Sequence, residues 1–212
     1  MVNKVRVSAL KARTTSDLRQ AGIAILGYTA ERRDQRAPGP SALAINPYYS
    51  TSSGVDDPGN VLAVYLGYKS ATKADFPLLM CPMVKKMFPN RTISTQMANY
   101  VQNNTLSARS GSGGARVLGH QTANPAIAAA NWPIALHELD NYGGAARVWI
   151  LTNLDYALPK DMKKAGYNGP DTEISDSGWF KPEDLPPEPV WGNSRVRLYF
   201  DAHVAFVSRY AP

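Results

Sequence analysis

Residues 3–40, NKVRVSALKARTTSDLRQAGIAILGYTAERRDQRAPGP, contain the strongest structural signal in this chain. Apolar and small side chains recur in this stretch every three or four residues, which places them on one face of a helix. The first proline is Pro38, and the run Pro38-Gly39-Pro40 stops a helix. We therefore predict one helix over residues 3–35. Its apolar stripe consists of Val7, Leu10, Thr14, Leu18, Ala21, Ile25 and Tyr28, and its opposite face carries Arg6, Arg13, Asp17 and Glu31.

The predicted helix is long for a domain of this size. About 30 residues at a rise of about 1.5 Å each span roughly 45 Å. The stripe is also weakly apolar in its first half, where Ser8, Ala9 and Ala12 are small. We therefore expect part of the helix to project beyond the globular body.

The pattern changes after residue 40, where short apolar runs alternate with segments rich in glycine and proline. Runs of β-branched and aromatic residues favour strands, and clusters of Gly, Pro, Ser and Asp favour loops. The strand candidates are residues 92–102, 116–119, 146–153 and the two arms of a hairpin over 195–209. The loop candidates are residues 46–60, 107–114 and 158–189. Residues 61–67 and 76–80 fit either a helical turn or a strand.

These elements predict an α+β fold in which the long N-terminal helix packs on a loop-rich antiparallel sheet. We divide the chain into the helix, residues 1–36, and a globular α+β head, residues 37–212. The turn of the C-terminal hairpin falls at Asp201-Ala202. A tight type I′ turn needs positive φ at both residues, which alanine tolerates poorly. We predict a different turn or a longer loop there, with Asp201 capping local backbone amides.

Composition narrows the classes of protein. The 212 residues are 44% hydrophobic and 19% charged, which argues against a disordered chain, and no run approaches the roughly 20 apolar residues of a membrane span. A single cysteine, Cys81, excludes an intramolecular disulfide, and we expect a buried thiol.

The net charge of +6 comes mostly from residues 1–36, which hold eight Lys and Arg against three acids. Such asymmetry fits nucleic acid, an anionic membrane surface or a solvated helix face. The helix lacks interleaved aromatic residues on which bases could stack, so we do not expect nucleic acid to be a partner.

Motifs for catalysis are missing from the sequence. It has no glycine-rich phosphate loop and no metal-spaced cluster, and His120, His137 and His203 are isolated. A hydrolase built from these scattered histidines stays an alternative, but we expect no enzyme and no cofactor. Residues 171–178 alternate oxygen-bearing side chains, so Asp171, Glu173 and Asp176 are calcium candidates, although the spacing fails that of an EF-hand.

Two separated segments, residues 17–24 (DLRQAGIA) and residues 191–204 (WGNSRVRLYFDAHV), resemble type II secretion pseudopilins and related type IV pilin-like proteins of the H-X9-DG group. Residues 17–24, DLRQAGIA, followed by Tyr28, are similar to the stretch after the membrane helix of these proteins. Residues 191–204, WGNSRVRLYFDAHV, are similar to their C-terminal signature, which often continues with His and Val. Trp191 stands in place of the leading histidine, and Ala202 in place of the glycine after Asp201; His203 follows. Between the two segments, Cys81-Pro82 and residues 147–155, RVWILTNLD, match a Cys-Pro and an apolar strand that ends in Asp.

The resemblance implies a pilin-like fold and a structural subunit without catalytic residues. Val7, Leu10, Leu18, Ala21, Ile25 and Tyr28 would then belong to an assembly helix whose apolar membrane half and processing site precede these 212 residues. Such subunits are anchored in the inner membrane, polymerise with other pseudopilins and act with the secretion machinery. The expected location is the periplasmic side of the bacterial inner membrane. A relative without the anchor is the alternative, as is a basic protein that binds nucleic acid through the N-terminal helix.

Overall fold

The structure, a computed structural model, describes residues 2–41, 44–45, 47–50, 57–70, 72–90, 99–103, 116–119, 132–158, 161 and 185–209. Its helices are α1 (Val2–Glu31), α2 (Pro58–Tyr65), α3 (Pro82–Met87) and the 3-10 helices η1 (Pro77–Leu79) and η3 (Leu136–Tyr142). Its strands are β1 (Ala44–Ile45), β2 (Tyr48–Tyr49), β3 (Ala74–Asp75), β4 (Tyr100–Gln102), β5 (Trp149–Asn153), β6 (Ser194–Tyr199) and β7 (Val204–Ser208).

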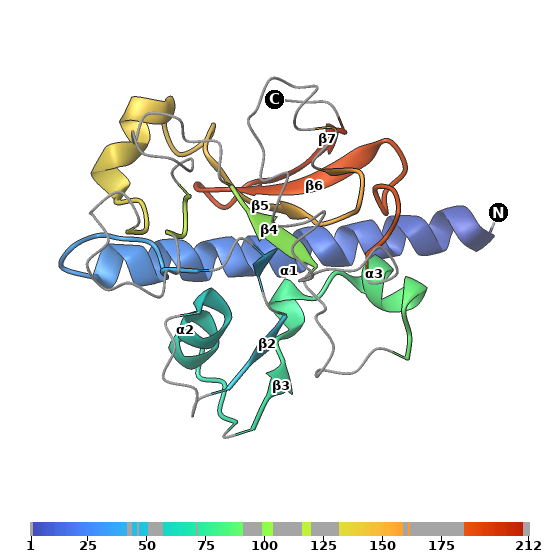
Figure 1. Cartoon of the computed structure of the whole chain (residues 1–212), viewed down its shortest axis with the longest axis horizontal. Helices are drawn as coiled ribbons and strands as arrows, with labels where there is room; N and C mark the ends of the chain where they lie inside the picture. Colours follow the sequence, from blue (N-terminus) through green and yellow to red (C-terminus); the bar gives the residue numbers. More distant parts are fainter. Residues whose placement is uncertain are drawn as a thin grey trace.

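The strands form a five-stranded sheet of order β1-β4-β5-β6-β7 and a separate β2-β3 pair. All neighbours pair antiparallel, with Tyr100 opposite Asn153 and Val196 opposite Phe206. The helix α1 packs against β6 and β7 on one side and against α2, α3 and η1 on the other (Figure 1). The predicted α+β fold is therefore confirmed, and a long N-terminal helix packed against an antiparallel sheet is a pilin-like layout.

The main hydrophobic core lies around α1. Leu18 and Ile25 of the helix are fully buried together with Tyr100 of β4 and Leu198 of β6. A second, smaller cluster contains Val101, Trp149, Leu154, Leu158 and Leu185. Since β5 contributes side chains to both clusters, every one of its residues is buried, which explains its near-continuous apolar sequence.

The helix α1 ends at Glu31, four residues before the predicted end. A turn follows the helix. In it, both side-chain oxygens of Asp34 accept hydrogen bonds from the guanidinium of Arg32, at 2.9 and 3.1 Å. Gln35 then adopts a φ of +49°, which a right-handed helix does not allow. This local hydrogen bonding competes with the helix before the proline run is reached.

The strand predictions have mixed outcomes. Residues 195–209 form the predicted hairpin of β6 and β7, and β5 occupies the second part of the predicted strand 146–153. The strand predicted at 116–119 is wrong: Gly119 N–H donates to the carbonyl of Arg116 at 3.1 Å, and Gly119 has a φ of +71°, so the chain turns there. Of the candidate 92–102 the structure describes residues 99–102, which include β4.

The loop predictions are partly wrong. The segment 46–60 contains β2, and its last residues begin α2, which Asp57 caps by accepting from Gly59 N–H at 2.8 Å. The open alternatives at 61–67 and 76–80 resolve as the helices α2 and η1. In the predicted surface loop 158–189, the described residues Leu158, Asp161 and Leu185 are buried. The predicted loop 107–114 lies outside the described residues.

Candidate functional site

The packed face of α1 is the one that the sequence predicts. Thr14, Leu18, Ala21 and Ile25 are buried, and the remaining stripe residues Val7, Leu10 and Tyr28 are half-buried. On the opposite face Arg6, Arg13 and Glu31 are exposed, but Asp17 is not. Only 17% of its side chain is exposed, so its assignment to a solvated face is wrong. The helix therefore presents a wider face to the body than the stripe alone.

The carboxyl group of Asp17 is partly buried without close polar partners. Its buried Oδ2 makes no hydrogen bond with a described residue, and the nearest cation, Arg13 Nε, lies 3.6 Å away. Burial raises the pKa of Asp17, and the positive charge of Arg13 opposes that rise. We therefore expect the ionised carboxylate of Asp17 to lower the stability of the packed helix at neutral pH.

The helix touches the hairpin at Gly22, so the two segments that carry the sequence resemblance meet. A Cβ atom placed on Gly22 would lie 2.8 Å from Leu198 Cδ1 and 3.0 Å from Ala202 Cα and Cβ. The Leu198 side chain could move aside, but contacts of 3.0 Å with Ala202 are tighter than most Cβ atoms make, so glycine favours this close approach of the helix to the hairpin. The sequence motif contained Gly22, but nothing in its spacing revealed this role.

The hairpin turn has three residues, Phe200, Asp201 and Ala202. Tyr199 N–H donates to the carbonyl of His203 at 2.9 Å, and Ala202 N–H donates to the carbonyl of Tyr199 at 3.0 Å. Ala202 has a φ of +64°, the left-handed conformation that this hairpin type requires at its third residue. The prediction of a longer turn than type I′ is confirmed. The alanine nevertheless adopts the conformation that glycine favours, at the position where the resembling family has glycine.

Asp201 has the predicted capping role. Its Oδ1 accepts a hydrogen bond from His203 N–H at 3.1 Å. The imidazole of His203 pairs with the same carboxylate through Nδ1 and stacks on Tyr199, with ring centroids 4.1 Å apart. These contacts hold the turn in shape.

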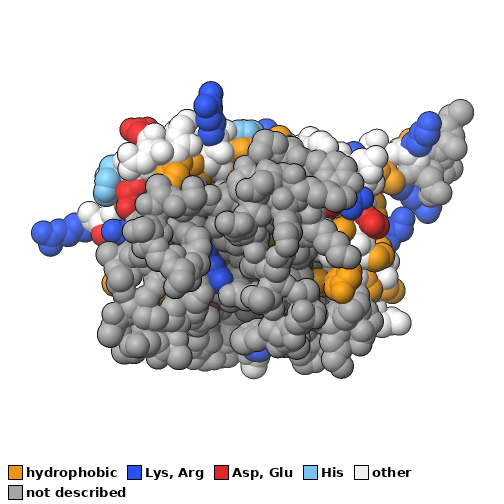
Figure 2. All heavy atoms as spheres, turned by 45° about the horizontal axis from the view of Figure 1, so that its top comes forward, with side chains coloured by type: hydrophobic (Ala, Val, Ile, Leu, Met, Phe, Trp, Pro, Cys, Tyr) orange, Lys and Arg blue, Asp and Glu red, His pale blue; other side chains and the backbone are white. Residues whose placement is uncertain are grey.

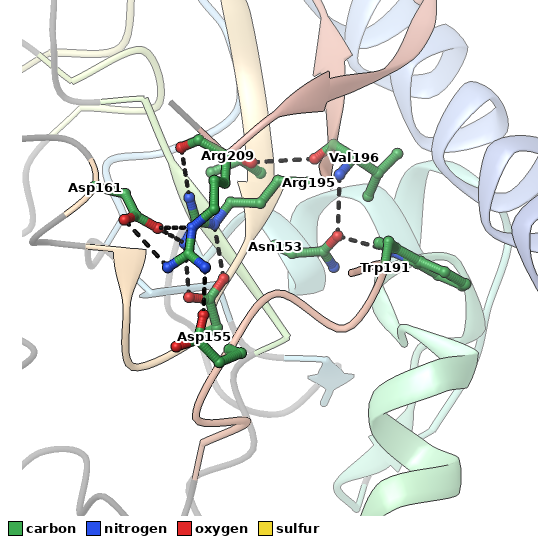
Figure 3. A network of polar contacts seen from close by, with 9 residues as sticks. Asn153, Asp155, Asp161, Trp191, Arg195, Val196 and Arg209 are labelled. Carbon is green, nitrogen blue, oxygen red and sulfur yellow. Dashed lines mark hydrogen bonds and ion pairs between the residues drawn. The ribbon is translucent and has the colours of Figure 1, made fainter. Parts of the chain in front are cut away.

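Trp191 anchors the same strands from the inside. Its indole Nε1–H donates to Asn153 Oδ1 at 3.1 Å, and its ring meets Phe206 edge-on at 5.6 Å between centroids. Asn153 Oδ1 also accepts from Val196 N–H at 3.2 Å, so one side chain joins β5 to β6 (Figure 3). Trp191 therefore has a structural role, in which its large ring fills the space beside Phe206 and its N–H binds β5.

A buried ion network fixes the far end of the hairpin. The guanidinium of Arg195 donates to both oxygens of Asp155 at 2.7 Å and to Asp161 at 2.7 Å (Figure 3). Arg209 binds Asp161 at 3.0 Å and also pairs with Glu188. Burial raises the pKa of Asp155, opposed by the hydrogen bonds and charge of Arg195. The sequence flagged Asp155 as the end of an apolar strand, but its partners lie far along the chain.

The other candidate residues lie away from the contact between α1 and the hairpin, or outside the described residues. His137 is exposed on η3, and His120 and the calcium candidates Asp171, Glu173 and Asp176 lie outside the described residues. Cys81 is fully buried, as predicted. Among the described residues, no three His, Cys, Asp or Glu side chains are placed to hold a metal ion.

Comparison of the chain with known protein families, curated proteins and solved structures finds no match. No helix within the described residues has the length and apolar character needed to cross a membrane. The described residues thus form a junction, in which α1 packs against the hairpin at Gly22. The first turns of α1 lie outside the body.

Proposed function

We propose that this chain is the head and the proximal helix of a filament subunit of the pseudopilin type. The observation that carries the proposal is the asymmetry of α1, a single helix of 30 residues. Its C-terminal half is embedded in the core, and its N-terminal end extends past the rest of the body (Figure 1). A helix fixed at one end and free at the other can continue into a bundle of identical helices.

The junction supports the mechanical part of this role. Force applied along α1 would reach the sheet through Leu18 and Ile25, which pack in the main core, and through Gly22, which lies against the hairpin. The antiparallel ladder of β6 and β7 and the Arg195 network hold the other side of that contact. In this proposal the residues of the two sequence motifs serve to fasten the helix, and none takes part in catalysis.

The proposal places the head on the periplasmic side of the inner membrane, with other pseudopilins and the secretion machinery as partners. An apolar helix segment encoded upstream of residue 1 would continue α1 into the membrane and then into the filament core. The support for this step is the resemblance of residues 17–28 to the region that follows the membrane helix in pseudopilins.

Photo-crosslinking in cells that express the complete natural gene tests the proposal. Benzoylphenylalanine is placed at Val5 or Ala12, which are exposed on the projecting half of α1, and at exposed Lys69 as the matched control. We expect ladders of covalently linked copies from the two helix positions and none from Lys69. Absence of ladders from Val5 and Ala12, or a gene that encodes no apolar segment upstream, would refute the filament role.

A further inference from the structure

Two helices at the projecting end of the molecule each place cationic side chains next to one exposed apolar side chain. At the tip of α1 the exposed Val5 stands between Lys4 and Arg6, and in α3 the exposed Met87 follows Lys85 and Lys86. Val5 is 68% exposed and Met87 is 46% exposed. The two helices are in contact, and α3 lies beside the N-terminal half of α1 (Figure 1). We call these six residues the basic tip.

The charge of the basic tip is weakly neutralised. Lys85 pairs with Asp75 at 3.6 Å, whereas Lys4, Arg6 and Lys86 make no ion pair with a described residue. The first acid of α1 is Asp17, which is three turns away and lies next to Arg13. Figure 2 shows Lys and Arg side chains standing at this projecting end, with hydrophobic side chains nearby. The tip therefore combines at least three free cations with two exposed apolar side chains.

We infer that the basic tip docks on an anionic lipid bilayer. Cations next to exposed aliphatic side chains suit the membrane interface, where ammonium and guanidinium groups meet headgroup phosphates and the apolar side chains enter the acyl boundary. The inference deepens the proposed function, because it assigns the membrane side of the head a contact of its own. It does not depend on the upstream segment, since the residues that bind lipid are all present in this chain.

The composition favours a bilayer over nucleic acid. Single-strand binders stack bases on aromatic side chains, and α1 has no aromatic residue before Tyr28. Duplex binders place polar and cationic groups on phosphates, where Val5 and Met87 would stay exposed to water without gain. A lipid surface uses both kinds of side chain at once.

Sedimentation with lipid vesicles tests the inference on the 212-residue chain. The probes are vesicles of phosphatidylcholine alone and vesicles with about one third phosphatidylglycerol, at about 50 mM and about 500 mM salt. We expect binding to the anionic vesicles only, and much weaker binding at the higher salt. Each cation near an anionic surface contributes about fivefold in affinity.

The double variant Arg6→Ala/Lys86→Ala removes two exposed cations of the tip that make no ion pair with a described residue, and it should therefore lose about 25-fold in affinity. The matched control Arg33→Ala/Lys69→Ala removes two exposed cations from outside the tip and should stay within about twofold. Val5→Ser/Met87→Ser should weaken binding several-fold and leave its salt dependence unchanged. Unaltered thermal unfolding of each variant shows that folding is intact.

Three results would overturn the inference: no binding to anionic vesicles, equal loss from tip and control variants, or retention of duplex DNA that the tip substitutions abolish while vesicles stay unbound. The last result would assign the tip to nucleic acid. None of them bears on the crosslinking ladders, so failure of lipid docking and failure of the filament role are distinguishable.

Discussion

The two halves of α1 have the same secondary structure and opposite surroundings. Between residues 4 and 13 no side chain is buried, whereas the second half buries Thr14, Leu18, Ala21, Gly22, Ala24, Ile25 and Thr29. The first half contains four Lys or Arg and no acid. Packing against the head therefore stabilises the second half, while the first half depends on intrinsic helix preference and on whatever covers it.

The largest expected effect tests this difference in burial. Leu18→Ala removes a fully buried side chain and should lower the free energy of unfolding by about 3 kcal/mol. Leu10→Ala, the matched change in the first half, should cost less than about 1 kcal/mol, because Leu10 is only half-buried. Urea denaturation measures both, and equal losses would show that the halves do not differ in their contribution to stability.

The close approach at Gly22 gives the next effect. Gly22→Ala should lower the free energy of unfolding by about 2 kcal/mol, since the new Cβ meets the backbone of Ala202. This loss would appear although alanine is the better helix former by about 1 kcal/mol. Ser8→Ala on the exposed half should instead raise stability by a few tenths of a kcal/mol. A stabilising Gly22→Ala would contradict the proposed junction.

A double-mutant cycle sharpens the assignment of that contact. Ala202→Gly removes one of the atoms that a Cβ at Gly22 would strike, so it should recover about 1 kcal/mol of the Gly22→Ala loss. By itself Ala202→Gly should change stability by less than about 1 kcal/mol. Relief of the positive φ at residue 202 and loss of a buried methyl group oppose each other there. Strict additivity would mean that the two residues do not touch.

The smallest effect concerns Asp17, at the boundary between the halves. Its folded-state pKa lies above the ordinary value of 3.8, so the ionised carboxylate destabilises the folded state and protonation removes that cost. Asp17→Asn should therefore stabilise the protein by up to about 1 kcal/mol at neutral pH. The difference should vanish as the pH falls to about 3, below the unfolded pKa. Thermal unfolding at both pH values checks this, and a benefit independent of pH would refute it.

Most of the fold could be predicted because its signals are local. The period of three to four residues in α1 and the alternation in the C-terminal hairpin depend on side chains near one another in sequence. The strand predicted at 116–119 failed because Leu118 N–H bonds the side chain of Gln102, a distant residue that supports a turn. The early end of α1 followed from side-chain hydrogen bonds of Asp34, which periodicity does not register.

The junction was harder to predict than the elements that form it. The motif residues Trp191 and Asp201 were identified, and the capping role of Asp201 followed from turn chemistry. The contact between Gly22 and Ala202 and the ion pairs of Arg195 with Asp155 and Asp161 join residues 34 or more positions apart. No local pattern encodes such pairs, because they depend on how the packed elements are placed against one another.

One long helix, the face that it buries and the C-terminal hairpin could all be predicted from the amino-acid sequence, since hydrophobic periodicity acts over a few residues. The tertiary structure adds where the helix enters the core, the close approach that favours glycine at position 22, and the packing of α3 beside the N-terminal half of α1. Those features arise from packing between remote segments, where the available space and the neighbouring charges are set by the whole fold.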